Sequence, residues 1–245
     1  MSEEGAEPGS RVVLVTGGSR GIGAACVSWF VANGDRVAFT SRSAEPRVRE
    51  DGALALRCDG TKSDQVEAAF KEIEERFGPV EVLVANAGIT RDTLIARMSE
   101  EAWSEVIDTN LTGAFLVAKR AVTKMLRLHR GRVIFVSSVG AFVGLPGQAN
   151  YAASKAGLVG MARALAREVA SRSITVNVVA PGLVATDMIE ALGTERIEQM
   201  TGLVPLGRTA TPDEIADAVG FLASAGANYI TGAVLPVDGG MGMGL

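Results

Sequence analysis

Arg11-Val-Val-Leu-Val-Thr16, followed directly by Gly17-Gly-Ser-Arg-Gly-Ile-Gly23, is the stretch of sequence that decides the fold. The first part is a short apolar run, which predicts a buried β-strand, and the second is a turn rich in glycine. Residues 21–33 then have a helical pattern that ends before Gly34. A strand, a glycine turn and a helix in this order predict the first unit of an α/β sheet.

The rest of the chain repeats this alternation of strands and helices. Strands that are apolar on both faces and separated by helices predict a parallel sheet that is covered on both sides. We therefore expect one doubly wound α/β domain over residues 11–245, preceded by a flexible leader at residues 1–10. The further strands are expected at 36–40, 53–58, 82–85, 132–137, 175–180 and 233–237, and the further helices at 63–77, from Ser99, at 112–128, at 151–170 and from Thr211.

Composition excludes several classes of protein. The chain has 245 residues, of which 47% are hydrophobic, and this is enough for a sizeable core in one domain. The net charge of -4 argues against a general nucleic-acid binder, whose surface is basic. No apolar run approaches the roughly 18 residues of a membrane span, and the N-terminus lacks a signal-peptide pattern, so we expect a cytoplasmic protein. Cys26, Cys58 and the single histidine, His129, lack the spacing of a metal site, and no metal is predicted.

The glycine turn predicts a dinucleotide site. Gly17, Gly21 and Gly23 lie between the first strand and its helix, where backbone amides approach a pyrophosphate at the helix N-terminus. Glycines alone are equally consistent with a tight turn that binds nothing. Their place after the first strand of an alternating chain favours the dinucleotide.

The end of the second strand indicates which dinucleotide binds. An acidic residue there would accept hydrogen bonds from the ribose 2'-hydroxyl of NAD, but Phe39-Thr-Ser-Arg42 contains none. Arg42, together with Arg20 in the glycine turn, suits a 2'-phosphate instead, through charge-assisted hydrogen bonds. The alternative is that both arginines are solvated surface residues. We expect NADP(H) as the cofactor.

A candidate proton donor lies in Tyr151-Ala-Ala-Ser-Lys155. A Tyr and a Lys four residues apart on a helix project from the same face. A fixed ammonium at about 5 Å favours phenolate by roughly 3 kcal/mol, which moves the pKa of the phenol toward neutral pH. The spacing alone is more often that of a surface Tyr beside a solvated Lys, so the other motifs decide its meaning.

The glycine turn, Asn86-Ala-Gly88, Asn110, Ser138, Tyr151 and Lys155 together resemble the short-chain dehydrogenase/reductase family, over essentially the whole chain after residue 10. This resemblance implies a Rossmann fold whose seven parallel strands have the order 3-2-1-4-5-6-7. Three segments look like the bacterial 3-oxoacyl-[acyl-carrier-protein] reductases, and the last of them is most similar to the branch that serves long-chain and mycolic-acid elongation. The segments are Gly88-Ile-Thr-Arg-Asp92, Gly147-Gln-Ala-Asn-Tyr-Ala-Ala-Ser-Lys155 and Pro236-Val-Asp-Gly-Gly-Met-Gly-Met-Gly244.

The resemblance implies NADPH-dependent reduction of a 3-oxoacyl group on acyl carrier protein to the 3-hydroxyacyl group, in fatty acid elongation. An alternative is an NADP-dependent oxidoreductase for CoA thioesters, steroids or other ketones and alcohols, because these substrates share the catalytic residues. A third interpretation is a silent dinucleotide-binding protein, but a scaffold needs none of the four catalytic residues.

Four residues carry the catalytic roles that the resemblance implies. Tyr151 gives a proton to the substrate carbonyl oxygen, while Lys155 lowers the pKa of the phenol and holds the nicotinamide ribose. Ser138 hydrogen-bonds the same substrate oxygen, and its spacing from Tyr151 selects it over Ser137. Asn110 keeps a water that links Lys155 to solvent, although standing alone it would be interpreted as a satisfied helix amide.

The resemblance also implies a set of cofactor contacts. Asp59 meets the adenine edge, although it could instead cap a turn, and Gly60 follows it where relatives usually carry an apolar residue. Asn86, Ala87 and Gly88 line the adenosine ribose. The complete predicted set is Gly17, Ser19, Arg20, Gly21, Ile22, Gly23, Arg42, Asp59, Asn86, Ala87, Gly88, Tyr151, Lys155 and, around the nicotinamide, Pro181, Gly182 and Thr186.

The substrate side is predicted from a short amphipathic segment at residues 186–208, bracketed by Gly182 and Gly207. We expect it to form a mobile lid. Its apolar side chains face either an acyl chain or the core: Met188, Ile189, Leu192 and Ile197.

An acidic carrier protein requires a basic rim on its enzyme. Arg172 matches one docking arginine of the family, and His129 occupies the other docking position with Arg130 beside it, which makes docking pH-sensitive. Together with Arg127 they are expected at helix ends near the pocket mouth, although His129 could simply be a solvated helix-end residue. The resemblance further implies a homotetramer built on the Tyr151 helix, its neighbouring helix and the last strand.

Overall fold

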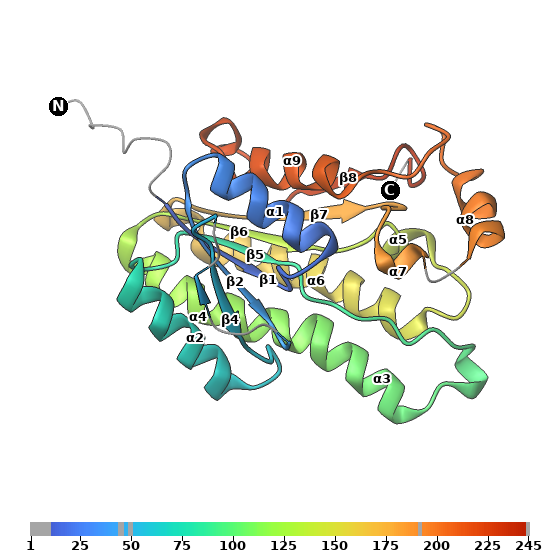
Figure 1. The fold of residues 1–245 in the computed structure, drawn as a ribbon, viewed down its shortest axis with the longest axis horizontal. Coiled ribbons are helices and arrows are strands. Elements are labelled where there is room, and N and C mark those ends of the chain that lie inside the picture. The colour runs from blue at the N-terminus through green and yellow to red at the C-terminus, as the bar shows by residue number, and fades with distance from the viewer. Residues whose placement is uncertain (1–10, 44–46, 49–50, 191–192, 244–245) are drawn as a thin grey trace.

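A computed structural model describes residues 11–43, 47–48, 51–190 and 193–243 of the chain (Figure 1). The leader predicted at residues 1–10 lies outside the described residues. No helix in the described ranges is long and apolar enough to cross a bilayer, and no group of three or more metal-binding side chains occurs in them.

The centre of the fold is a twisted sheet in which seven strands are parallel, so the predicted order 3-2-1-4-5-6-7 is confirmed. An eighth strand of two residues, β3 (Arg47–Val48), pairs antiparallel with β4 at the edge and was not predicted. From this edge inward the order is β4 (Leu54–Arg57), β2 (Arg36–Ser41), β1 (Val12–Thr16), β5 (Val82–Ala85), β6 (Gly131–Val136), β7 (Ile174–Pro181) and β8 (Val234–Val237).

Helices cover both faces of the sheet (Figure 1). One core lies between the sheet and α1 (Gly21–Ala32) and α9 (Pro212–Ala223). The second core lies between the opposite face and the long helices α2 (Ser63–Arg76), α4 (Gly113–Leu128) and α6 (Ala149–Val169). This two-sided burial explains why the parallel strands are apolar on both faces.

Shorter elements join these layers. The side chain of Ser99 caps α3 (Glu100–Ile107) by accepting from the Ala102 N–H, and Thr211 with Glu214 forms a capping box that starts α9. The remaining elements are η1 (Ile95–Arg97), the π-helical turn η2 (Asp108–Thr112), α5 (Gly140–Val143), η3 (Ala170–Arg172), α7 (Asp187–Glu190), α8 (Thr194–Thr201) and η4 (Ala225–Ala227).

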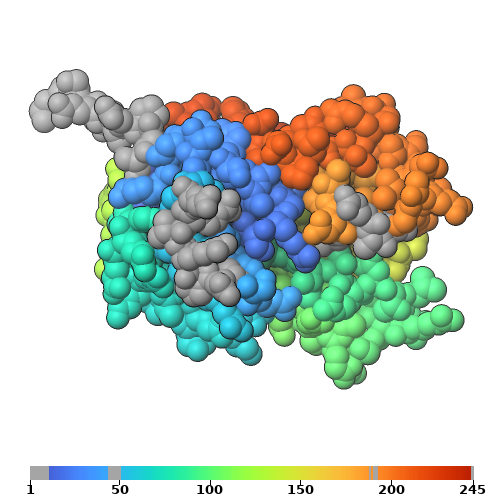
Figure 2. All heavy atoms as spheres, in the orientation of Figure 1, coloured from blue at the N-terminus to red at the C-terminus, as the bar shows by residue number. Residues whose placement is uncertain are grey.

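The carboxyl ends of the parallel strands meet at one edge of the sheet, which positions the candidate site. The loops that leave β1, β5, β6 and β7 carry most of the residues singled out in the sequence. Ligands of open α/β sheets bind outside these ends. In Figure 1, α5, α7 and α8 lie together at this end of the molecule, and in Figure 2 the orange α8 and the green region of α3 form it.

Candidate functional site

The glycine turn after β1 packs too closely to accept side chains. A Cβ on Gly23 would lie 2.1 Å from the Gly17 carbonyl oxygen and 2.6 Å from Nδ2 of Asn86. Gly17 has φ +67°, in the left-handed region that favours glycine. The turn leads directly into α1, so backbone N–H groups of the helix N-terminus lie at the open edge of the sheet. This cradle fits the pyrophosphate of a dinucleotide.

Thr16 and Asn86 hold the turn on the neighbouring strand β5. The Thr16 hydroxyl accepts hydrogen bonds from the backbone N–H groups of Asn86 and Ala87, both at 3.1 Å. Nδ2 of Asn86 donates to the carbonyl oxygens of Thr16 and Gly17, at 3.0 and 3.2 Å. The Asn86 side chain therefore supports the turn, and its place beside a ribose stays a prediction.

The other predicted residues of the turn are placed differently. Ser19 and Arg20 are exposed, whereas Ile22 is partly buried and packs against the core under α1. The guanidinium of Arg20 lies 3.8 Å from the carboxylate of Asp187, at the start of α7. The turn and the predicted lid are thus linked by an exposed ion pair.

Arg42 and Asp59 line the same surface cavity of about 540 Å³, at the ends of β2 and β4. Oδ1 of Asp59 accepts hydrogen bonds from the backbone N–H and the hydroxyl of Thr61, at 3.0 and 2.8 Å, so Asp59 does cap a turn. Burial opposes ionisation of Asp59, but the Thr61 bonds and the charges of Arg42 and Lys62 outweigh it and lower its pKa. A Cβ on Gly60 would meet no described atom within 4 Å, so the space that an apolar side chain would fill is open.

Ser137 and Ser138 have separate partners at the end of β6. Ser137 is buried, and its hydroxyl donates to the carbonyl oxygen of Lys155 at 2.8 Å. The Ser138 hydroxyl accepts from the Gly140 N–H at 3.1 Å and also hydrogen-bonds with Tyr151. Ser138 is therefore the member of the pair that lies beside the phenol.

Tyr151 lies in the first turn of α6 with its hydroxyl beside Ser138. Burial raises the pKa of Tyr151, the hydrogen bond with Ser138 lowers it by less, and the carboxylate of Asp92 raises it further. Nζ of Lys155 lies 5.7 Å from the centre of the phenol ring. The prediction that this lysine moves the pKa of Tyr151 toward neutral pH is wrong, because burial disfavours phenolate and the pKa is raised. The phenol therefore holds its proton at neutral pH, which is the state that can donate one.

Lys155 is buried one helical turn after Tyr151. Its Nζ donates to the carbonyl oxygen of Val136 at 2.8 Å, and burial lowers its pKa to about 8. A Cβ on Gly88 would lie 3.2 Å from Nζ, so the amine reaches the loop that follows β5. A pKa near working pH suits a group that exchanges protons.

Asn110 lies in η2, the π-helical turn between α3 and α4. Its Oδ1 accepts from the Ile89 N–H at 2.8 Å, and its Nδ2 donates to the Ile89 carbonyl oxygen and to the Ser154 hydroxyl, both at 3.0 Å. A Cβ on Gly88 would lie 3.3 Å from Oδ1 of Asn110, so Gly88 separates this amide from the Lys155 amine. All four predicted catalytic residues thus converge at one edge of the sheet.

The residues predicted around the nicotinamide lie at the end of β7 and in the loop after it. The Pro181 carbonyl accepts from the Val139 N–H at 2.8 Å, which joins the loops after β6 and β7. A Cβ on Gly21 would lie 3.3 Å from Cγ2 of Thr186, so the glycine turn faces this segment. Gly182 donates its N–H to Val237 at 3.0 Å and closes the segment against β8.

The segment predicted as a lid contains α7 and α8. Leu192 and the side chain of Met188 lie outside the described part of the chain. Ile189 and Ile197 are each partly buried. Whether the segment moves stays a prediction.

Of the predicted basic cluster, Arg172 and His129 are in direct contact. His129 ends α4 with φ 55°, and its Nε2 lies 2.7 Å from a guanidinium nitrogen of Arg172. Because a guanidinium only donates, Nε2 is the acceptor and the ring proton sits on Nδ1. Arg130 is paired with Glu81 at 2.7 Å.

The predicted place of this cluster near the pocket mouth is wrong within a single chain. His129 and Arg130 directly precede β6, and Arg172 precedes β7, so they lie at the edge where the strands begin. Tyr151 lies at the opposite end of α6, whose 21 residues separate its two ends by roughly 30 Å. The error came from disregarding the direction of the strands.

Comparison with known proteins gives evidence on the family of this chain that is independent of the structure. A family model described as enoyl-(acyl carrier protein) reductase matches residues 17–242. The 3-oxoacyl-[acyl-carrier-protein] reductase MabA of Mycobacterium tuberculosis (strain ATCC 25618 / H37Rv) is 54% identical over 245 residues, covering 98% of this chain and 97% of that protein. The 3-oxoacyl-[acyl-carrier-protein] reductase FabG of Vibrio cholerae is 47% identical over 238 residues, covering 95% of this chain and 98% of that protein.

The lowered pKa of Lys155 predicts how stability depends on pH. Between pH 8 and 10.5 the unfolded chain binds more protons at this lysine than the folded one, so this group makes stability rise with pH across that window. Below pH 8 the buried ammonium of Lys155 lowers the free energy of unfolding by its full amount, which is a few kcal/mol. Lys155→Met removes the buried charge, so we expect the variant to gain stability over the wild type at pH 7, and this gain to shrink as pH approaches 10.5.

Urea unfolding of both proteins across this pH range measures the difference directly. Other titrating groups, including the buried cysteines, are common to the two proteins and cancel in the comparison. Lys155→Met also loses the hydrogen bond to Val136, and this changes the stability difference by the same amount at every pH. If the stability difference between the two proteins does not change between pH 8 and 10.5, the lowered pKa of Lys155 is contradicted.

Proposed function

Since the chain belongs to the short-chain dehydrogenase/reductase family, we propose that it reduces 3-oxoacyl groups carried by acyl carrier protein to 3-hydroxyacyl groups in fatty acid elongation, with NADPH as reductant. The observation that carries this proposal is the convergence of Asn110, Ser138, Tyr151 and Lys155 at the carboxyl edge of the sheet. The names of the relatives supply the substrate class.

The reaction requires one hydride and one proton. NADPH, when bound, supplies the hydride that reaches the carbonyl carbon of the substrate. The Ser138 hydroxyl and the Tyr151 hydroxyl lie side by side, so both can hydrogen-bond the substrate oxygen and orient it. As that oxygen gains negative charge, Tyr151 gives it the phenol proton. The raised pKa of Tyr151 means that the phenol still holds this proton at neutral pH.

Lys155 and Asn110 are proposed to return the proton to Tyr151. The Lys155 amine has a pKa of about 8, so at neutral pH it holds a proton that it can pass on. Asn110 lies across Gly88 from this amine and would keep a water on the path to solvent. Lys155 would also hold the nicotinamide ribose through its remaining donors.

The cofactor is proposed to lie along the carboxyl edge from Asp59 to Thr186. Its pyrophosphate fits the cradle at the N-terminus of α1, and the loop after β5 would line the ribose. Arg20 and Arg42 are both exposed and basic, and Phe39-Thr-Ser-Arg42 at the end of β2 contains no acidic residue, which supports a 2'-phosphate there. We therefore propose NADPH over NADH.

Carrier docking is proposed at Arg172, His129 and Arg130, with a homotetramer as the active form. Because this cluster and Tyr151 lie at opposite ends of α6, the cluster of one chain would serve the site of another. Small exposed residues along α6 support close contact between subunits: Ala153, Ala156, Gly160 and Ala164. Gly157 instead makes room for Leu111 of the same chain.

The proposed reaction is tested by following NADPH oxidation with three substrates. A 3-oxoacyl carrier protein, acetoacetyl-CoA and a steroid ketone are compared, with Tyr151→Phe as the control that lacks the proton. We expect fastest turnover of the carrier-bound substrate and a loss of at least a hundredfold in kcat for Tyr151→Phe. Preference for the steroid would support the broader oxidoreductase, and no turnover of any substrate would support a silent binding protein.

Arg42→Asp tests the choice of cofactor. The change removes a charge-assisted bond to the 2'-phosphate and sets a repulsive charge in its place, so we expect KM for NADPH to rise by about 10- to 100-fold. KM for NADH should change little, because its free 2'-hydroxyl can bond to a carboxylate. Steady-state kinetics with both cofactors measure the ratio, and an equal effect on both would refute the role of Arg42.

Arg172→Glu tests the docking cluster. A reversed charge should repel an acidic carrier and raise KM for the carrier-bound substrate several-fold, while turnover of acetoacetyl-CoA stays unchanged. Arg76→Glu is a suitable control, because Arg76 is also an exposed helix arginine but lies on α2. The docking proposal fails if both substrates respond to Arg172→Glu in the same way.

A further inference from the structure

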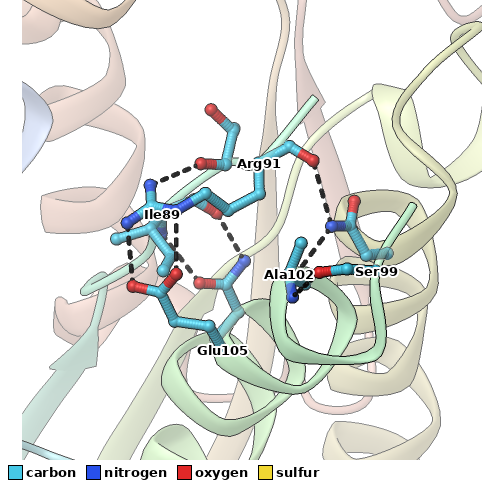
Figure 3. A network of polar contacts seen from close by, with 8 residues as sticks. Ile89, Arg91, Ser99, Ala102 and Glu105 are labelled. Carbon is cyan, nitrogen blue, oxygen red and sulfur yellow. Dashed lines mark hydrogen bonds and ion pairs between the residues drawn. The ribbon is translucent and has the colours of Figure 1, made fainter. Parts of the chain in front are cut away.

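Residues 89–93, here called the anchored segment, follow the loop after β5 and lie beside the start of α6. Asn110 bonds both the N–H and the carbonyl oxygen of Ile89, as Figure 3 shows. At the other end, the Thr93 N–H donates to the Gly147 carbonyl oxygen at 2.9 Å. The segment is thus tied at its first residue to η2 and at its last residue to the loop before Tyr151.

Asn150 is the residue directly before Tyr151, and it is fully buried. Its Nδ2 donates to the carbonyl oxygens of Arg91 and Ala102, both at 3.2 Å, and its Oδ1 accepts from the Tyr151 N–H at 2.8 Å. One amide therefore joins three elements: the anchored segment, α3 and the first turn of α6 (Figure 3). Removal of this buried amide would leave the Arg91 carbonyl oxygen and the Tyr151 N–H without these partners, whereas the Ala102 carbonyl lies inside α3 and keeps its helical hydrogen bond.

Arg91 and Glu105 tie the same segment to α3 from outside. Nε and a terminal nitrogen of Arg91 donate to the two carboxylate oxygens of Glu105, each at 2.8 Å. The two side chains are 47% and 40% exposed. A second terminal nitrogen of Arg91 donates to the Thr90 carbonyl oxygen at 2.9 Å, so the guanidinium also stiffens its own backbone (Figure 3).

The anchored segment carries a charge that acts on Tyr151. Nε2 of Gln148 donates to a carboxylate oxygen of Asp92 at 2.7 Å, and this carboxylate raises the pKa of the phenol. The other groups facing the phenol are Ser138, from the loop after β6, and Lys155, from α6 itself. The position of the segment therefore sets the charge beside Tyr151.

We infer that Asn150 and the Arg91–Glu105 pair are positioning residues, which hold the anchored segment against α6 and thereby set the surroundings of Tyr151. They act through the anchored segment, which carries Asp92 and is bonded to Asn110, and through the backbone of Tyr151. The kinetic part of this inference rests on the proposed reduction, whereas its spectroscopic part does not.

The chain offers a direct measurement of the Tyr151 phenol. It contains two tyrosines, and the other, Tyr229, is fully exposed. In a Tyr229→Phe background, carbon-13 labelled tyrosine gives one NMR signal whose shift with pH reports the pKa of Tyr151. This titration needs neither substrate nor cofactor.

The two charge reversals at the pair distinguish positioning from direct electrostatics. Arg91→Glu adds negative charge and Glu105→Arg adds positive charge, so a direct charge effect would move the pKa of Tyr151 in opposite directions. If the pair positions the segment, each reversal releases it and takes the Asp92 carboxylate away from the phenol, so both variants lower the pKa. The double variant Arg91→Glu/Glu105→Arg restores the ion pair and should return the pKa to the wild-type value.

Asn150→Ala should lower the pKa of Tyr151 in the same way, and the reversals at the exposed pair decide the test if this buried variant does not fold. Arg76→Glu is the matched control, because Arg76 is 51% exposed and paired with Glu72 at 3.0 Å on a distant helix. We expect no shift of the pKa in this control.

Kinetics provide the second readout. Each single reversal should lower kcat about tenfold, because misplaced reacting groups are costly, and the double variant should recover most of the loss. Opposite pKa shifts in the two reversals, or no shift in either, would overturn the inference whatever the activities are. A wild-type protein that reduces none of the substrates would refute the proposed function alone, because the titration still decides the positioning roles.

Discussion

Two hydrogen bonds that run in opposite directions between α6 and the end of β6 set the geometry on which the site depends. Nζ of Lys155 donates to the Val136 carbonyl oxygen, and the Ser137 hydroxyl donates to the Lys155 carbonyl oxygen, both at 2.8 Å. An unpaired buried polar group costs about 1–3 kcal/mol, so these bonds hold the helix on the strand. Ser138 directly follows Ser137, and Tyr151 lies one turn before Lys155. The contact therefore also brings the two hydroxyl groups together.

The same burial determines where the proton resides. It raises the pKa of Tyr151 and lowers that of Lys155 to about 8, because a low-dielectric environment disfavours both phenolate and ammonium. The phenol is thus a neutral acid, and the amine binds its proton less tightly than it would in water. Such a pair suits donation to an oxygen that becomes negative during a reaction. The spacing of Tyr151 and Lys155 predicts a lowered pKa for the phenol, but only the fold shows that both side chains are buried and that burial raises this pKa.

The sheet was predictable because each parallel strand is a short apolar run between helices, and neither register nor side-chain geometry is needed to see this. β3 was not predictable, because a strand of two residues has no pattern and exists only through its pairing with β4. The spacing that the family resemblance implies selected Ser138 over Ser137, and Ser138 is the one that lies beside the Tyr151 hydroxyl. Asn150 was missed although it adjoins Tyr151. Its partners are backbone carbonyl groups at residues 91 and 102, and side-chain identities do not reveal these.

Strand direction explains why neighbours in the sequence can lie far apart in the molecule. Arg130 and Ser138 flank β6, yet one lies at the edge where parallel strands begin and the other at the edge where they end. The starting edge holds ion pairs that need no ligand, such as Arg11 with Asp35 at 2.7 Å and Arg130 with Glu81. The finishing edge holds the glycine cradle and the hydroxyl groups. If a carrier docks at the starting edge, as proposed, its acyl group would enter the site at the finishing edge of another chain.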